Sequence, residues 1–333
     1  MFKARKNRHK PEIIIFKEKD MRKIKTAALV LLVLLLMGTM VFTGCNRGGG
    51  KASKPTFALC ISHVTNAFTK TVADTMTAAA AASGADLIIN EASNDISKQV
   101  SQIESVVNQK VNVIIIEPVS TNGVIPAIEA AEKAGIRVVV FNQQISDPSK
   151  ATTFVGVSND TLGKLEMDRA IKDLGGKGNI AILLGPLGSE AQIGRSKGYS
   201  DALAGYPDIK VVFEETGEWT TENGLRLAEN WLQTGIKIDA FVCQNDGMAL
   251  GAVKAVEDKG LSGKVKIYGL DAVPDALKAV KEGRLTITVS QETERQSEKA
   301  VEMAMKLYKG ETVDKINLVE GGVIDINNVD NYL

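Results

Sequence analysis

The sequence predicts an α/β fold made of two doubly wound parallel-sheet lobes. Short apolar runs alternate with amphipathic stretches along most of the chain, the pattern of repeated strand–helix units. The chain has 333 residues, and a single hydrophobic core rarely grows past about 250–300 residues. Hydrophobic residues make up 44% and charged residues 24% of the chain, as in an ordinary globular protein.

Nine apolar runs are predicted to be strands. Most are rich in β-branched residues and apolar nearly throughout, as expected for strands buried on both faces of a parallel sheet. In chain order they read FALCIS, DLIIN, VNVIII, RVVVF, NIAILL, KVVFE, DAFVC, KVKIYG and LTITV.

Helical patterns lie between these runs, including 66–83, 96–109, 124–134 and 248–259. Several end at a glycine, where a left-handed residue that closes a helix is easiest to form. These glycines are Gly84, Gly135 and Gly260. The segment TFVGVSN, residues 153–159, follows the first set of units and is expected to carry the chain into the second lobe.

The N-terminal segment predicts export. From Met21, a better start than Met1, a basic MRKIK precedes an apolar run over 27–42. Thr43-Gly44-Cys45 follows and resembles the lipobox of bacterial lipoproteins, so Cys45 is the predicted lipidation site. Residues 1–44 are then an N-terminal extension and lipoprotein signal peptide, with a plain transmembrane helix as the alternative. Residues 45–54, rich in glycine, serine and lysine, predict a flexible tether.

Composition and motifs exclude several classes of protein. Beyond residue 44 the chain keeps 30 Lys+Arg and 37 Asp+Glu, an acidic balance unsuited to nucleic acid. It contains no CxxC, HExxH, GxSxG, GxGxxG or P-loop motif, so no metal, cofactor or catalytic residue is predicted, and the protein is not expected to be an enzyme. Cys60 and Cys243 lie in apolar runs and are interpreted as buried residues.

Polar residues directly after the apolar runs are the candidate ligand residues, because ligands of such sheets bind outside the carboxyl ends of the strands. The alternative for each is an ordinary loop or helix-cap role, and Asp246, which could cap the helix after it, is interpreted as structural and not as ligand-binding. The candidates are Ser62 to Asn66, Asn142, Gln143, Asn245, Asp271 and Gln291.

From about Thr56 to its C-terminus the chain resembles the ribose-type sugar-binding proteins of ABC importers, the periplasmic binding protein type I fold. Four segments carry the resemblance: FALCISHVTNAF, GSEAQIGRSKGY, QNDGMALGA and YGLDAVPDALKAVKEGRLTITVSQ. It implies a three-segment hinge between two lobes. Lobe 1 is expected to comprise 55–156 plus 292–320, and lobe 2 to comprise 157–291 plus 321–333.

The resemblance also implies a set of ligand contacts. Fixed amides and a carboxylate can hydrogen-bond to hydroxyl groups, and flat aromatic rings can cover the C–H faces of a sugar. For each aromatic the alternative is core packing, which we assign instead to Trp231. The implied ligand residues are Ser62, Asn66, Phe68, Asn142, Gln143, Trp219, Asn245, Asp271 and Gln291.

Departures from the family pattern affect the expected ligand. Asn142-Gln143 stands where ribose binders have an aspartate–arginine pair. Ile193 replaces the first arginine of the second-lobe helix, Arg195 keeps the second, and Thr69 replaces an aromatic. Losing two bidentate donors disfavours ribose. A neutral sugar, polyol or cyclitol is therefore expected, with Gln192 as a possible substitute donor and His63 as a rim residue.

The predicted function is that of a monomeric substrate-binding lipoprotein on the outer face of the cytoplasmic membrane, in the periplasmic or extracellular space. It would deliver its ligand to the permease subunits of an ABC importer. An alternative is a receptor that presents a sugar-like signal, such as an autoinducer or a chemosensory ligand, to a membrane sensor. A lactose-repressor-type regulator would need a helix-turn-helix headpiece, which residues 21–54 do not supply.

Overall fold

The computed structural model of the protein describes residues 54–333. The predicted signal peptide, the lipidation site Cys45 and the tether up to residue 53 lie outside these described residues. Within residues 54–333, no helix has both the length and the apolar character needed to cross a membrane.

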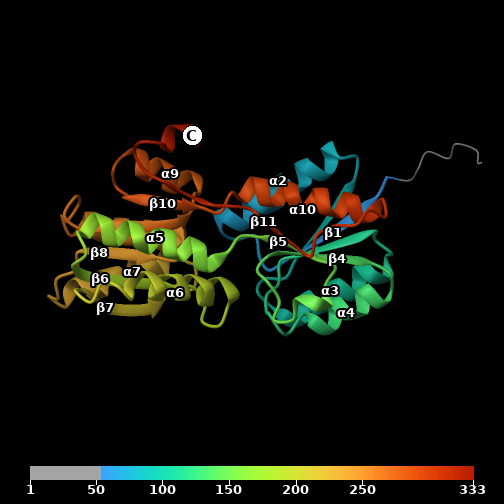
Figure 1. Ribbon diagram of the computed structural model, residues 1–333, viewed down its shortest axis with the longest axis horizontal. Coiled ribbons are helices and arrows are strands. Elements are labelled where there is room, and N and C mark those ends of the chain that lie inside the picture. The colour runs from blue at the N-terminus through green and yellow to red at the C-terminus, as the bar shows by residue number, and fades with distance from the viewer. Residues whose placement is uncertain (1–53) are drawn as a thin grey trace, which may run out of the picture. The chain divides into compact units, whose positions relative to one another are not determined.

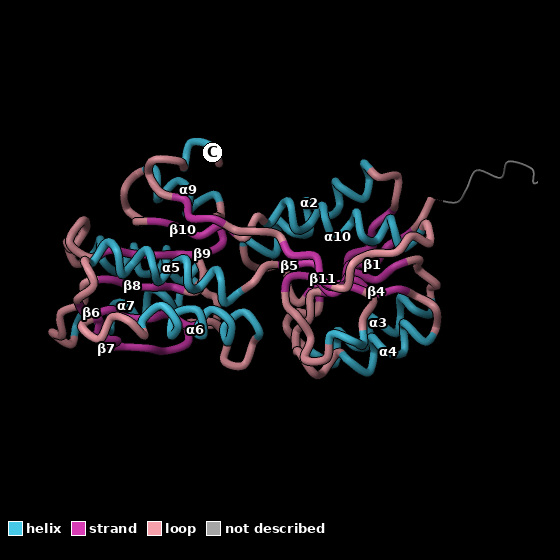
Figure 2. The backbone as a smooth tube through the Cα atoms, in the orientation of Figure 1, coloured by secondary structure: helices cyan, strands magenta, loops and turns pink. Residues whose placement is uncertain are grey.

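The first of two sheets has six strands, and every neighbouring pair in it is parallel. Figures 1 and 2 show its strands on the right of the view. From edge to edge the order is β11 (Ile316–Leu318), β5 (Thr153–Gly156), β4 (Arg137–Asn142), β3 (Val113–Ile116), β1 (Thr56–Ile61) and β2 (Asp86–Glu91).

The second sheet also has six strands, and only its edge strand β12 runs antiparallel to its neighbour. Its order is β12 (Gly322–Ile324), β10 (Ile287–Ser290), β9 (Lys266–Asp271), β8 (Ala240–Cys243), β6 (Gly178–Leu184) and β7 (Ile209–Thr216).

Helices cover both faces of each sheet. On the first sheet, α2 (Ala67–Ala82) lies beside α10 (Thr293–Tyr308), and α3 (Ile96–Asn108) and α4 (Ile125–Lys133) cover the other face (Figure 1). The second sheet has two helices on one face and three on the other. These are α5 (Asn159–Leu174) and α6 (Glu190–Leu203), opposite α7 (Thr221–Gln233), α8 (Asp246–Asp258) and α9 (Pro274–Lys281).

The predicted α/β fold of two doubly wound sheets is confirmed. All nine apolar runs form strands, and Gly84, Gly135 and Gly260 have positive φ directly after helices. The chain passes from the first sheet to the second after β5, returns after β10 and crosses again between β11 and β12. The pattern did not predict β11 and β12, which have three residues each, and it read 153–159, which contains β5, only as a connection between the lobes.

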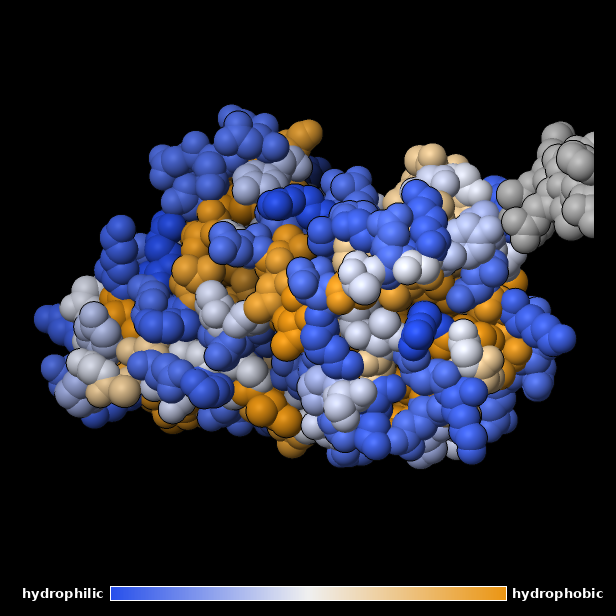
Figure 3. Space-filling model, turned by 45° about the vertical axis from the view of Figure 1, so that its right-hand side comes forward, coloured by the Kyte–Doolittle hydropathy of each residue, from blue (hydrophilic) through white to orange (hydrophobic). Residues whose placement is uncertain are grey.

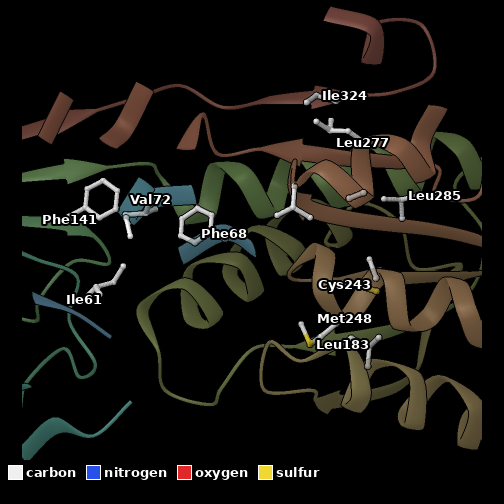
Figure 4. Close-up of a cluster of buried hydrophobic side chains, with 14 of the residues drawn as sticks. Ile61, Phe68, Val72, Phe141, Leu183, Cys243, Met248, Leu277, Leu285 and Ile324 are labelled. Carbon is white, nitrogen blue, oxygen red and sulfur yellow. The ribbon is translucent and has the colours of Figure 1, made fainter. Parts of the chain in front are cut away.

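Strand β1 illustrates why these runs are apolar throughout. Phe57, Leu59 and Ile61 pack toward α2, whereas Ala58 and Cys60 pack on the opposite face, because successive side chains of a strand point to opposite sides. Figure 4 shows Ile61 in the buried cluster with Phe68 and Val72 of α2. Hydrophilic residues cover much of the face seen in Figure 3.

Both cysteines of the described chain are buried and free, as the sequence predicts. Cys60 lies in β1 and Cys243 in β8, on different sheets. Burial raises the pKa of the Cys60 thiol to about 12 and also raises that of Cys243, so both stay protonated and unreactive. Trp231 is likewise core, stacked 5.3 Å from Phe213 between ring centroids.

Candidate ligand-binding site

A polar cavity lies at the carboxyl ends of the strands and is lined from both sheets. It encloses about 380 Å³ of empty space when its opening to solvent is included. The lining residues are His63, Asn66, Phe68, Thr69, Glu117, Asn142, Gln143, Ala191, Arg195, Trp219, Asn245, Asp271 and Gln291.

The structure brings eight of the nine predicted ligand residues together around this cavity. Ser62 is the exception, since it is buried behind the lining with its hydroxyl 2.9 Å from His63 Nδ1. His63, interpreted from sequence as a rim residue, is itself a lining residue. Contact of these side chains with a ligand remains a prediction.

Asn66 lines the cavity and also caps helix α2. Its Oδ1 accepts hydrogen bonds from the Thr69 N–H and the Thr69 hydroxyl, each 2.9 Å long. Its Nδ2 lies 2.9 Å from His63 Nε2. Because Nδ2 is a donor, His63 Nε2 accepts, and the ring hydrogen is assigned to Nδ1, facing Ser62. These contacts hold the first turn of α2 against the site.

Glu117 is a lining residue that the sequence interpretation missed. It directly follows β3 and is buried, with only 2% of its surface exposed. Its Oε1 accepts a hydrogen bond of 2.8 Å from Gln143 Nε2. The signal was present in the sequence, since Glu117 is the polar residue after the run VNVIII, the rule that selected the other candidates.

Three lining residues have a backbone conformation with positive φ. The φ angle is 61° at Asn142, 62° at Trp219 and 140° at Asp271. Such conformations cost on the order of 1–3 kcal/mol in residues other than glycine, and they concentrate at functional sites. With these backbone conformations, the three residues line the cavity from the strand ends and loops.

Within residues 54–333, Arg195 of α6 is the only guanidinium that lines the cavity, and it is 3% exposed. Its Nε donates to Asn159 Oδ1 at 3.1 Å, and its Nη1 donates to the carbonyl of Gln244. The guanidinium carbon lies 5.4 Å from the ring centroid of Trp219, a cation–π arrangement. The buried Arg195 guanidinium is thus held in place by the protein while it lines the cavity.

Gln192, the possible substitute for the missing arginine, does not line the cavity. Its Oε1 accepts from the Gly188 N–H at 3.1 Å and its Nε2 donates to the Ser196 hydroxyl at 3.0 Å. Both polar ends of this side chain are therefore used within the start of α6. Ile193 is 57% exposed and also lies outside the lining.

Asn245, not Asp246, caps helix α8, so the cap interpretation of Asp246 was wrong. Asn245 Oδ1 accepts from the Met248 N–H at 2.9 Å, and its Nδ2 donates to the Trp219 carbonyl at 3.1 Å. Asp246 is the first helical residue and is fully buried. Its Oδ2 accepts from the Val273 N–H and the Thr288 hydroxyl, which fastens the loop after β9.

Asp271 ends β9 and places a buried carboxyl at the cavity. Its Oδ1 accepts a 2.5 Å hydrogen bond from Gln291 Nε2. Burial raises the pKa of Asp271, while the charge of Arg195 and the hydrogen bond from Gln291 lower it. Burial and the neighbouring Asp271 carboxyl raise the pKa of Asp246 as well. Because the two buried carboxyls are adjacent, protonation of one of them is favoured, which removes one negative charge from the pair.

Glu166 of α5 is fully buried and is not a lining residue of the cavity. Its Oε2 accepts a 2.5 Å hydrogen bond from the Tyr199 hydroxyl, and its Oε1 has no hydrogen-bond partner among the described residues. Burial raises the pKa of Glu166 from 4.5 to about 8. Between pH 4.5 and about 8, the Glu166 carboxyl is therefore protonated in the native protein and ionised in the unfolded chain.

We expect the stability of the protein to fall as pH rises from about 5 to 8, because the native state holds more protons than the unfolded state there. Glu166→Gln should reduce this slope by up to roughly 1.4 kcal/mol per pH unit. Urea unfolding at several pH values measures the pH dependence of the unfolding free energy. Asp168, an exposed residue of the same helix, provides the control variant Asp168→Asn. Equal slopes for Glu166→Gln and parent would contradict the assignment.

Chemically, the arrangement suits recognition of hydroxyl groups. The cavity is lined by two carboxyls, Glu117 and Asp271, by several amides and by the Arg195 guanidinium. A hydroxyl group can donate to a carboxylate or amide oxygen and accept from an N–H group. In the described part of the chain, no cluster of side chains is suited to hold a metal ion.

Two doubly wound sheets with such a cavity at their strand ends define a solute-binding protein. A family model described as a periplasmic binding protein domain matches residues 57–312, and the chain belongs to this family. The resemblance expected from the sequence is thereby confirmed.

Known proteins similar to the chain cover most of its length. A xylitol-binding protein of Mycolicibacterium smegmatis is 35% identical over 290 residues, 86% of this chain and 82% of that protein. A solved ABC transporter solute binding protein from Bacillus halodurans C-125, with bound myo-inositol, is 34% identical with a TM-score of 0.81, covering 85% of this chain and 98% of that one.

A second solved structure is a periplasmic solute binding protein of an ABC transporter from Actinobacillus succinogenes 130z, with bound D-allose. It is 32% identical with a TM-score of 0.81 and covers 84% of this chain and 100% of that one.

Proposed function

We propose that this protein is the substrate-binding component of an ABC importer and that its ligand is a neutral sugar, polyol or cyclitol. The observation that carries the proposal is the cavity itself, in which amides, two carboxyls and one guanidinium converge from two sheets. A relative named as a xylitol-binding protein and two similar solved structures with bound myo-inositol and D-allose support the same class of ligand.

The charges of the lining favour an uncharged ligand. Among the described residues that line the cavity, Glu117 and Asp271 are carboxyls and Arg195 is the one guanidinium. A phosphate or carboxylate group on the ligand would meet carboxylate oxygens in a buried site, and such like-charge contacts are costly. Since Gln143 stands where ribose binders have an arginine, we expect a polyol or cyclitol to bind better than ribose.

A ligand screen tests this proposal. We expect myo-inositol, xylitol or D-allose to raise the melting temperature by roughly 5 °C at 100 times Kd, because ligand binding stabilises the native state by about 2.7 kcal/mol there. Glucuronate and myo-inositol phosphate serve as charged counterparts, and ribose as the comparison sugar. Preference for a charged counterpart over its neutral parent would refute the proposed ligand class.

The signal-receptor alternative is not favoured, because the solved structures described above belong to ABC transporters. Membership in the periplasmic binding protein family supports a location outside the cytoplasm. The finer assignment, attachment to the membrane by a lipid on Cys45, rests on the apolar run followed by Thr43-Gly44-Cys45. That the protein is a monomer is part of the same proposal.

Cys45→Ala should therefore shift the protein from the membrane to the soluble fraction, or leave it as unprocessed precursor. The physical reason is that several acyl chains on one residue hold a protein at a membrane firmly, whereas one chain binds only marginally. Fractionation of cells that express each form measures the change, with Cys60→Ala as a control that keeps the anchor. A Cys45→Ala protein that is processed and anchored like the parent would exclude lipidation at this residue.

A further inference from the structure

We propose that Glu117 is a positioning residue that fixes the orientation of the Gln143 amide and so makes this side of the cavity select hydroxyl groups over oxo groups. The inference rests on the proposed function, since it assumes a hydroxylated ligand.

Glu117 joins the carboxyl ends of three strands. It follows β3, and its Oε2 accepts a 2.9 Å hydrogen bond from the Ser62 N–H at the end of β1. Its Oε1 accepts the 2.8 Å hydrogen bond from Gln143 Nε2 at the end of β4. Each carboxylate oxygen thus accepts from a protein donor, and through these two bonds Glu117 holds its neighbours in place.

The backbone of Glu117 is held as firmly as its side chain. Its N–H donates to the Cys60 carbonyl at 3.0 Å, and its own carbonyl accepts from Gln99 Nε2 at 2.9 Å. Gln99 is fully buried, and its Oε1 accepts from the Val119 N–H at 2.9 Å. With the main chain bound on both sides, the carboxylate stays within reach of Gln143.

This geometry determines which end of the Gln143 amide meets the ligand. A carboxylate only accepts hydrogen bonds, so the group of Gln143 that points at Glu117 is its NH₂. Because the amide is planar, Oε1 points away from Glu117, and Gln143 lines the cavity. An acceptor oxygen is therefore presented to the ligand at this position.

An acceptor at this position discriminates between functional groups. A ligand hydroxyl can donate its hydrogen to Gln143 Oε1. A ketone or carboxylate oxygen at the same place has no hydrogen to donate and leaves two acceptors facing each other. A buried acceptor left without a donor weakens binding on the order of tenfold or more.

The test is a double-mutant cycle with myo-inositol as the probe, measured by calorimetry on the full-length protein. Glu117→Gln keeps the size of the side chain and can still accept from Ser62, but its NH₂ requires the Gln143 amide to turn over. We expect a loss of about tenfold in affinity in the parent background and less than about twofold when Gln143→Ala is already present. The exposed Glu104→Gln of α3 is the matched control.

A second readout needs no ligand. The side-chain amide resonances of Gln143 are assigned by their absence in Gln143→Ala, and exchange of their hydrogens with water is measured in the free protein. One hydrogen should exchange slowly in the parent and fast in Glu117→Gln. Glu117→Asp, which is too short to reach both Ser62 and Gln143, should also exchange fast and serves if Glu117→Gln fails to fold.

The outcomes separate the two proposals. Equal affinity losses in both backgrounds, or unchanged amide exchange in the Glu117 variants, would overturn the positioning role. If the parent binds none of myo-inositol, xylitol and D-allose, the proposed ligand class fails, while the amide exchange still decides the orientation of Gln143.

Discussion

Asp271→Asn is expected to weaken ligand binding at least tenfold while raising the melting temperature of the ligand-free protein. The carboxylate is 7% exposed and lines the cavity, and each hydrogen bond from a ligand hydroxyl to a charged acceptor contributes about 1.5–3 kcal/mol. Stability should rise because burial raises the pKa of Asp271, so its ionised form is a cost to the native state near neutral pH.

Asparagine is the informative replacement at this position. The φ angle of 140° at Asp271 strains any non-glycine residue, and asparagine keeps the shape and one acceptor oxygen. Asp271→Ala should bind more weakly still, because it also removes the partner of Gln291 Nε2.

The pH dependence of binding gives an independent check on Asp271. Ligand hydroxyls are bound by the ionised carboxylate, so affinity should be lost as pH falls through the raised pKa of Asp271. Asp271→Asn should lack this part of the dependence. Calorimetry over a pH series measures it, with the exposed Asp275→Asn as the control. If the Asp271→Asn protein binds the ligand as tightly as the parent, the Asp271 carboxylate does not contribute to ligand binding.

Much of this fold follows from local pattern. The nine apolar runs are predicted as strands because they are continuous and apolar, and most are buried on both faces, as in β3, where all four residues are buried. The edge strands β2 and β7 are more exposed but keep runs of several apolar residues. Strand β11 was missed because it has only three residues, too few to form such a run.

The site was predictable to the extent that it depends on topology. Polar residues after parallel strands meet at one edge of a sheet, and this rule selected Asn142, Asp271 and Gln291 correctly as lining residues. Side-chain direction was not predictable, because it depends on contacts between distant segments. Ser62 is turned toward His63, and Gln192 toward Gly188 and Ser196.

Trp219 shows how a distant contact determines the shape of the cavity. The residue follows β7 in the loop before α7, and its indole packs directly on Gly185 at the end of β6. A Cβ atom at position 185 would lie 2.0 Å from Trp219 Cη2, closer than any real contact. Glycine is therefore required at 185 for the indole to stay where it lines the cavity beside Arg195.

Trp219→Ala should weaken ligand binding by tenfold to a hundredfold and leave unfolding cooperative, since burying an aromatic side chain contributes about 1.5–3 kcal/mol. Gly185→Ala should weaken binding too, because it displaces the indole. Gly205→Ala, where the added methyl group meets no atom within 4 Å, is the control.

Fluorescence identifies the tryptophan that senses the ligand. Trp231 is stacked in the core on Phe213 and Phe241, away from the cavity lining. Ligand addition should therefore change the emission of the parent and of Trp231→Phe, and change it much less in Trp219→Phe. Normal binding by Trp219→Ala, or a ligand response that persists in Trp219→Phe and disappears in Trp231→Phe, would place the ligand away from this cavity. Gly185→Ala links the two readouts, because it should lose affinity and emission change together while both tryptophans remain in the chain.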